Sequence, residues 1–280
     1  MRQYLRRDDT HHIAAFTSSG RTIGIISFRL SRWDTEHFGY NVALIEAVII
    51  SELDYDQKLE ITKKLLAEFH TWCQAAQIRF VSVKLSALDL PVIHGFEHCG
   101  FNYLESWIYN KYDLNRVDQL GQTSYELRLA RPTDCDFMLK YAKGAFATHR
   151  FHADSHIAPD KAETLYEKWI LTAFNDPNQR ILTLDVEDRP VAFMIYYKND
   201  LRPYFGLQFA MWKMGLLDPK SRGRGLGTDF FMALPHYHYK EGLDVVDSGL
   251  SIRNLASLNL HNKLNFKVVS VLVTLHKWLR

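Results

Sequence analysis

Segments with strand character and segments with helix character alternate along the whole chain of 280 residues. Residues 23–30 (Ile-Gly-Ile-Ile-Ser-Phe-Arg-Leu) and 42–50 predict strands, 56–77 predicts an amphipathic helix, and 78–85 predicts a further strand. Such alternation favours a mixed α/β fold, in which helices cover the faces of a sheet.

One polar segment interrupts this alternation. Residues 115–124 (Asn-Arg-Val-Asp-Gln-Leu-Gly-Gln-Thr-Ser) lack an apolar pattern and predict a linker, so we expect two domains, residues 1–120 and 121–280. Each half ends with a short helix that closes on Gly100 or Asn265, followed by a Phe and a strand. This suggests a weak internal duplication, although unrelated α/β proteins also show that succession.

The second half repeats the alternation with more elements. We expect helices at residues 138–147, 160–174, 227–242 and 255–263, strands at 125–130, 181–186, 191–198, 205–217 and 244–250, and a terminal pair of strands within 266–279.

Charge and cysteine content exclude several classes of protein. Lys and Arg number 34 against 32 Asp and Glu, a net charge of +2. So small an excess gives no strong electrostatic attraction for nucleic acid. Cys73, Cys99 and Cys135 show no CxxC spacing, so we expect neither a metal site nor a disulfide framework. The start of the chain lacks a signal-peptide pattern, and no apolar run is long enough to span a bilayer. We therefore expect a cytoplasmic protein without membrane association.

A glycine-rich segment, Arg222-Gly-Arg-Gly-Leu-Gly-Thr228, lies between a strand that ends at Leu217 and a helix. Unpaired N–H groups and the positive end of a helix dipole meet at such a junction, which makes it an anion site. Glycines let the backbone approach a ligand, and Arg222 and Arg224 suit a pyrophosphate. A phosphate-binding Walker loop would need a lysine before Thr228, and a dinucleotide fingerprint would need glycine at Asp229.

Two motifs in order carry a family resemblance. Arg-x-x-Gly-x-Gly at residues 222–227, preceded by Leu217-Asp-Pro219, resembles the pyrophosphate loop of the GNAT acetyltransferases. Residues 254–266 resemble that family's Asn-x-x-Ala-x-x-Leu-Tyr-x-Lys-x-Gly-Phe helix, with Asn265 in place of the glycine. The resemblance implies a GNAT fold, a mixed twisted sheet flanked by helices, here preceded by a degenerate GNAT-like N-terminal domain.

The resemblance also implies a cofactor. In GNAT enzymes two parallel strands splay apart around the pantetheine of acetyl-CoA, which acts as co-substrate without a metal. A backbone N–H in residues 214–217 would then stabilise the oxyanion as an amine attacks directly through a tetrahedral intermediate. The cofactor-binding residues that it implies are Gly215, Leu216, Leu217, Arg222, Gly223, Arg224, Gly225, Leu226, Gly227, Thr228 and Asn254.

His261 stands where this family places its proton-donating tyrosine. A histidine can replace that acid, or it can merely bind pantetheine or helix backbone, or catalysis can have been lost. No acidic side chain occurs on the strand expected at 205–217, where many family members carry a general base. An amine of low pKa, such as an amino sugar, removes the need for one.

Three further segments resemble TDP-fucosamine acetyltransferase and its relatives, which acylate nucleotide-linked 4-amino sugars. They are residues 146–154, 165–170 and 33–39. The candidate acceptor-binding residues are Arg150, His152 and Asp154, in an expected loop between two helices. Alternatively, aromatic residues of this region form core and the polar ones are solvated.

The sequence thus predicts an N-acetyltransferase that moves an acetyl group from acetyl-CoA to the primary amine of a small molecule, with a nucleotide-linked amino sugar as the favoured acceptor. Acylation of another small amine or a protein amine, and an inactive acyl-CoA-binding module, stay as alternatives. The acceptor, the acyl length, the general base, the role of the first domain and the oligomeric state are left open, a homodimer being one option.

Overall fold

The computed structural model describes residues 9–51, 53–121, 123–146 and 149–279. Ala147 and Thr148, within the segment proposed above for the acceptor, lie outside the described residues. The chain forms two compact units: the first consists of Met1–Trp107 and Val271–Arg280, and the second of Ile108–Ser270.

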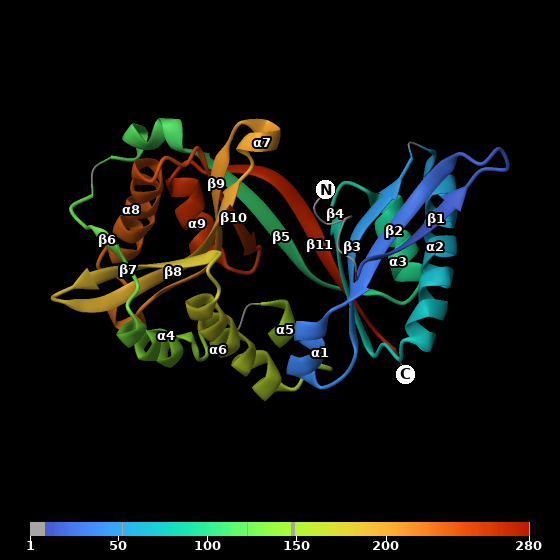
Figure 1. Ribbon diagram of the computed structural model, residues 1–280, viewed down its shortest axis with the longest axis horizontal. Coiled ribbons are helices and arrows are strands. Elements are labelled where there is room, and N and C mark those ends of the chain that lie inside the picture. The colour runs from blue at the N-terminus through green and yellow to red at the C-terminus, as the bar shows by residue number, and fades with distance from the viewer. Residues whose placement is uncertain (1–8, 52, 122, 147–148, 280) are drawn as a thin grey trace. The chain divides into compact units, whose positions relative to one another are not determined.

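Helices and strands of the first unit largely follow the predicted order (Figure 1). Asp54 ends the preceding loop and caps the long helix α2 by accepting the backbone N–H of Gln57, which fixes where that helix begins. The elements are β1 (His11–Phe16), β2 (Thr22–Leu30), α1 (Arg32–Phe38), β3 (Val42–Ile50), α2 (Tyr55–Ala75), β4 (Phe80–Ser86), α3 (Leu90–His98) and the beginning of β5 (Asn102–Asp113).

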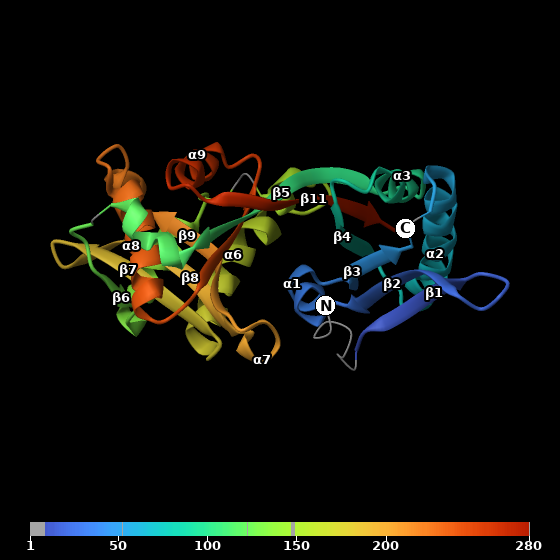
Figure 2. The same ribbon diagram turned by 90° about the horizontal axis from the view of Figure 1, so that it is seen from above.

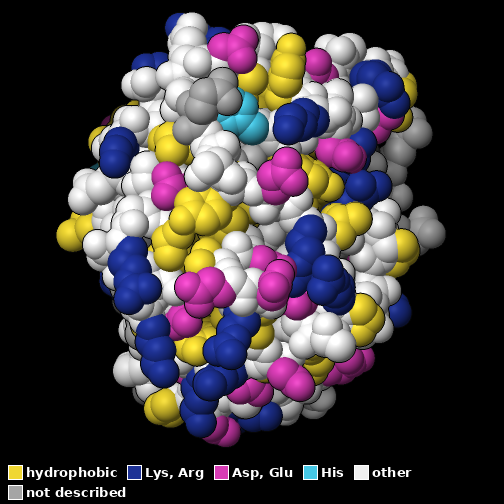
Figure 3. All heavy atoms as spheres, turned by 90° about the vertical axis from the view of Figure 1, so that its left-hand side faces the viewer, with side chains coloured by type: hydrophobic (Ala, Val, Ile, Leu, Met, Phe, Trp, Pro, Cys, Tyr) yellow, Lys and Arg dark blue, Asp and Glu magenta, His cyan; other side chains and the backbone are white. Residues whose placement is uncertain are grey.

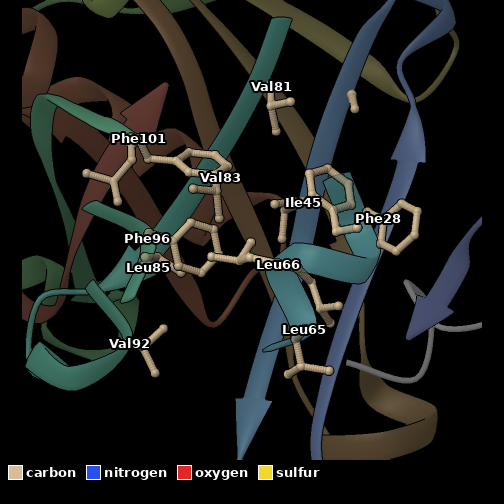
Figure 4. Close-up of a cluster of buried hydrophobic side chains, with 14 of the residues drawn as sticks. Phe28, Ile45, Leu65, Leu66, Val81, Val83, Leu85, Val92, Phe96 and Phe101 are labelled. Atoms are coloured by element: carbon tan, nitrogen blue, oxygen red, sulfur yellow. The ribbon is translucent and has the colours of Figure 1, made fainter. Parts of the chain in front are cut away.

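In the first unit the strands are ordered β1-β2-β3-β4-β11, with β1, β2 and β3 antiparallel and β3 parallel to β4. Helices α2 and α3 pack on this sheet (Figure 2). Figure 4 shows the resulting core, in which Leu65 and Leu66 of α2 meet Phe28, Ile45 and neighbouring strand residues.

The second unit contains both motifs singled out above. Its elements are the end of β5, the 3-10 helix η2 (Leu114–Leu120), β6 (Leu127–Leu129), η3 (Pro132–Asp134), α4 (Cys135–Ala142), α5 (Arg150–Ala153), α6 (Pro159–Asn175), β7 (Gln179–Val186), β8 (Arg189–Asp200), α7 (Arg202–Phe205), β9 (Gln208–Leu217), η4 (Pro219–Ser221), α8 (Leu226–Lys240), β10 (Val245–Ser251), α9 (Leu255–Lys263) and the beginning of β11 (Lys267–Trp278).

The sheet of the second unit is ordered β6-β7-β8-β9-β10-β5. Strands β6 to β9 are antiparallel and β9 runs parallel to β10, with α8 connecting these last two. Phe230 and Leu234 of α8 pack with Trp212 and Val246 in a buried cluster on one face. On the other face, Trp169 of α6 lies near Lys213 of β9. The unit therefore has the layered α/β organisation that alternation predicts.

The expected pair of strands within residues 266–279 is wrong. A single strand, β11 (Lys267–Trp278), occupies this segment, because Val-Val-Ser-Val-Leu-Val-Thr offers no Gly, Pro or Asn at which a hairpin could turn. Residues 272–278 pair antiparallel with β4. Residues 271–279 consequently pack with the first unit, so the compact units differ in extent from the expected division at 120 and 121.

The two turns on which the proposed repeat rests share one local geometry. Helix α3 is followed by Gly100 with φ of 81°, and α9 by Asn265 with φ of 60°, so both turns use the left-handed conformation. A Phe and a strand follow in each case, as expected.

Two further features concern the charge of the surface and the character of the helices. Acidic and basic side chains are interspersed over the face shown in Figure 3, in keeping with the near balance of charge. Within the described part of the chain, no helix combines the length and apolar character needed to cross a bilayer.

Candidate functional site

Helix α8 begins in a glycine-rich turn without a capping side chain. Its N-cap is Gly225, with φ of 82°, and Gly223 has φ of 77°; this left-handed backbone favours glycine. Among the described residues, no backbone carbonyl accepts from the N–H groups of residues 223–227. The helix start therefore presents several unused donors to one point, as an anion site requires.

A cavity of about 350 Å³ opens at this helix start, between α8 and α9. Six residues predicted from the glycine-rich segment and the strand before it line the cavity, together with one face of α9, a helix that the second motif assigned to the cofactor without naming these residues. The lining residues are Leu217, Arg222, Gly223, Gly225, Gly227, Thr228, Ala256, Asn259, Leu260 and Lys263.

Strands β9 and β10 part beside this cavity. Their parallel pairing ends at Trp212 opposite Ser248, whereas β9 continues to Leu217 and β10 to Ser251. On its other edge β9 stays paired with β8, and a bulge at Lys213 shifts the register where the parting begins. The backbone of β9 beyond Trp212 is thus left unpaired on its β10 side among the described residues.

Comparisons with solved structures identify the fold. A GCN5-related N-acetyltransferase from Sphaerobacter thermophilus superposes with a TM-score of 0.64 at 12% identity, covering 100% of this chain and 84% of that chain. A tandem GNAT protein from the clavulanic acid biosynthesis pathway gives 0.59 at 14% identity, covering 97% and 84%. A fungal GCN5-related glucosamine N-acetyltransferase region gives 0.60 at 12% identity, covering 98% of this chain and 34% of its multi-domain protein.

The chain has the GNAT fold. No protein-family model matches the sequence, and no curated protein sequence matches it, so the identification rests on structure and on the two motifs. The protein of the clavulanic acid pathway is a tandem GNAT protein, and this chain forms two compact units.

Donors around the cavity fit the diphosphate of coenzyme A. Arg222 lines the cavity at the start of α8, and Lys263 reaches it from α9 with Nζ 3.5 Å from Thr228 Oγ1. Two cations and the free amides would provide charge-assisted hydrogen bonds to phosphate oxygens. Gly227 differs from the other two glycines, since its φ is not positive and an added Cβ would meet Leu217 Cδ2 at an ordinary 3.5 Å.

Other predicted cofactor residues of this GNAT-fold chain lie outside the cavity lining. Asn254 caps α9, where its Oδ1 accepts the backbone N–H of Ser257 at 3.1 Å. Gly215 packs tightly on β8, because an added Cβ would lie 2.6 Å from Met194 Cε. The remaining ones are Leu216, Arg224 and Leu226.

His261 is 3% exposed and faces the point where the strands part. Its Nδ1 lies 2.7 Å from the carbonyl oxygen of Ser257, and its Nε2 lies 2.8 Å from the Ser248 hydroxyl. Because a carbonyl oxygen only accepts, Nδ1 carries the proton and Nε2 accepts from Ser248. Burial among Trp212 and Phe266 lowers the pKa of His261, which favours this neutral form.

Arg150, His152 and Asp154 come together on and just after α5, packed against α6. The ring of His152 stacks on Tyr166 with Nε2 3.2 Å from Glu163, and Asp154 is buried and accepts the backbone N–H of His156. Asp154 is therefore not a solvated surface residue. None of the three lines the cavity at α8.

Lys213 at the bulge is a polar residue that the sequence-based prediction missed. Its Nζ donates to Gln179 and to the Tyr197 hydroxyl, both at 3.3 Å, and lies 5.7 Å from the centre of the Trp169 ring. Burial lowers its pKa. A lone lysine in the apolar run Phe-Ala-Met-Trp-Lys-Met is the signal that would have identified it.

Proposed function

We propose that this protein moves an acetyl group from acetyl-CoA to the primary amine of a small acceptor. The observation that carries the proposal is the uncapped start of α8, with free amides at residues 223–227, directly beside two strands that part. An anion site and an open strand edge side by side match two adjoining parts of coenzyme A that must be held, its diphosphate and its pantetheine.

Bound acetyl-CoA would supply the activated acyl carbon. Arg222 and Lys263 would neutralise the diphosphate, and the unpaired backbone of β9 from Met214 to Leu217 would hold pantetheine and polarise the acyl carbonyl through an N–H. The rings of Trp212 and Phe231 pack against each other near this point and would provide an apolar surface beside those hydrogen bonds.

Nucleotide-linked amino sugars are the acceptor class that we propose first. Support comes from the sequence resemblance of the α5 and α6 segments and from the polar side chains of Arg150, His152 and Asp154, which α6 holds on its side of the sheet. The glucosamine N-acetyltransferase activity of the fungal relative belongs to that protein, and it makes glucosamine a sensible second probe.

A binding module without turnover is the second candidate. It is favoured by the state of His261, whose ring nitrogens both bond within the protein. As a proton donor to the thiolate, His261 would have to be charged, and burial opposes the charged form.

Calorimetry with acetyl-CoA tests the proposal first. We expect binding that is weakened when Arg222 is replaced by alanine. Thiol release with TDP-amino sugars, glucosamine, polyamines and peptides then tests transfer. Absence of acetyl-CoA binding would refute both candidates.

Replacement of His261 separates the two candidates. If His261→Ala lowers turnover at least tenfold while acetyl-CoA affinity stays within threefold, His261 takes part in transfer. Tight binding by the parent protein with no turnover on any amine would favour the binding module.

A further inference from the structure

Asp247 lies on β10, one residue before the last pair that joins β10 to β9. Its neighbours Val246 and Ser248 point toward α8 and α9, since Val246 packs with Phe230 and the Ser248 hydroxyl bonds to His261. Successive side chains of a strand alternate between faces, so Asp247 points to the opposite face.

A row of residues in register defines that opposite face. Asp247 lies beside Met211 of β9, and Met211 lies beside Tyr197 of β8. Lys213, two residues beyond Met211, bonds to Tyr197 and approaches Trp169 of α6. Asp247 therefore faces the α6 side of the sheet, next to the opening between the strands.

The carboxylate of Asp247 has little to neutralise it. Within the described residues, no hydrogen bond or ion pair joins it to another side chain, and its one polar partner is the backbone N–H of Ser248. Burial raises the pKa of Asp247. By contrast, Asp134 forms an ion pair with Arg128, and Asp244 accepts the N–H of Gln208. A half-buried carboxylate without a cation is suited to receive one.

We propose that Asp247 is the general base that removes a proton from the ammonium group of the acceptor. The inference rests on the proposed acetyl transfer. It fills the place left open by the absence of an acid on β9: the base comes from the neighbouring parallel strand, beside Met211.

Protons and electrons balance in this step. Asp247 takes one proton from R–NH₃⁺ and later releases it to solvent. The lone pair of the resulting amine forms the C–N bond to the acyl carbon as the C–S bond breaks. A second proton leaves the nitrogen and ends on the sulfur, which gives an amide and free CoA thiol. Lys213 donates to Gln179 and Tyr197, so it acts as a hydrogen-bond donor on this face and not as the base.

The test compares Asp247→Asn with Asp244→Asn in an acetyltransfer assay on the full chain. We expect Asp247→Asn to lower kcat/KM about 100-fold at pH 7, the usual scale for a general base, and to remove the acid limb of the pH profile. Asp244→Asn keeps an oxygen that accepts from the N–H of Gln208. This variant should leave kcat/KM and the pH profile unchanged.

An acceptor that is already neutral at pH 7, such as an alkoxyamine analogue of the amine, provides a second readout. With it, Asp247→Asn should reach at least one third of parental turnover, because no proton has to be removed first. Equal losses with both acceptors would overturn the inference and assign Asp247 a structural role, as would full activity of Asp247→Asn on the ordinary amine. Failure of the parent protein to bind acetyl-CoA would instead refute the proposed function.

Discussion

Helices α2 and α8 occupy the same place in the two units, since each connects a pair of parallel strands, yet their first turns are opposite in character. Asp54 caps α2 with its own carboxylate, which accepts the N–H of Gln57 at 2.8 Å. Gly225 opens α8 with no side-chain cap. The first turn of α2 already binds a carboxylate of the chain itself, whereas the first turn of α8 is free to bind an anionic ligand.

The helices that follow, α3 and α9, also differ in how they pack against α2 and α8. Helix α3 lies directly against α2, because a Cβ on Gly95 would lie 2.6 Å from Thr62 Cγ2. Helices α8 and α9 instead leave the cavity of about 350 Å³. Both strand pairs part, for the β3 and β4 pairing stops at Ile45 while β3 continues to Ile50. Parting strands are therefore common to both units, and the helix start and the helix spacing set the second unit apart. We propose that only the second unit binds the cofactor.

Making α8 resemble α2 should have the largest effect. Gly225→Asp places a carboxylate at the helix start, where it occupies the free amides and repels a diphosphate. We expect at least a 100-fold loss of acetyl-CoA affinity by calorimetry, or about 2.7 kcal/mol. Gly206→Asp is a matched control, because Gly206 also has a positive φ of 69° and open space around it. If Gly225→Asp left the affinity for acetyl-CoA unchanged, the difference between the first turns of α2 and α8 would have no bearing on cofactor binding.

Lowering the pH should reduce the folding stability of the second unit through His238, a buried residue of α8. His238 is fully buried and accepts a hydrogen bond from Trp212, and burial lowers its pKa to about 3. The unfolded chain therefore binds this proton first, so stability is fully present above pH 6.5 and falls below it. We expect a loss of about 1.7 kcal/mol between pH 6.5 and 5 by urea unfolding, because the slope reaches about 1.4 kcal/mol per pH unit only well below pH 6.5. His238→Gln, which can still accept from Trp212, should show a shallower slope; an identical slope would contradict this account.

Removing the cap of α2 should have the smallest effect and should not touch the cofactor. Asp54→Ala leaves the N–H of Gln57 without its acceptor, which costs about 1 kcal/mol of unfolding free energy. Urea unfolding measures this loss. A change in acetyl-CoA affinity beyond threefold would show that the first unit contributes to binding.

Local sequence signals located the elements of the site well. The helix predicted at 255–263 coincides with α9, and the glycine-rich turn starts α8 as expected. The face of α9 that lines the cavity, which includes Ala256 and Lys263, depends on how the helix is rotated against its neighbours. A motif read along the chain does not contain that rotation. For the same reason Asn254, assigned to the cofactor, has its side chain at the cap of its own helix.

Long-range pairing was beyond the sequence. Residues 267–278 form one strand, whose later part pairs with β4 in the first half of the chain, and nothing local specifies that partner. Asp247 was passed over because its neighbour Met211 is distant in sequence, and only strand register brings the two together.

The sequence by itself determined the alternation of elements, the left-handed turns at Gly100 and Asn265, and the uncapped glycine turn at the start of α8, since each follows from propensities within a few residues. Tertiary structure alone decided where β9 and β10 part, which way His261 and Asp247 point, and that the later part of the last strand packs with the first unit. These depend on contacts between segments far apart in the chain, whose register and spacing are fixed only when the sheet assembles.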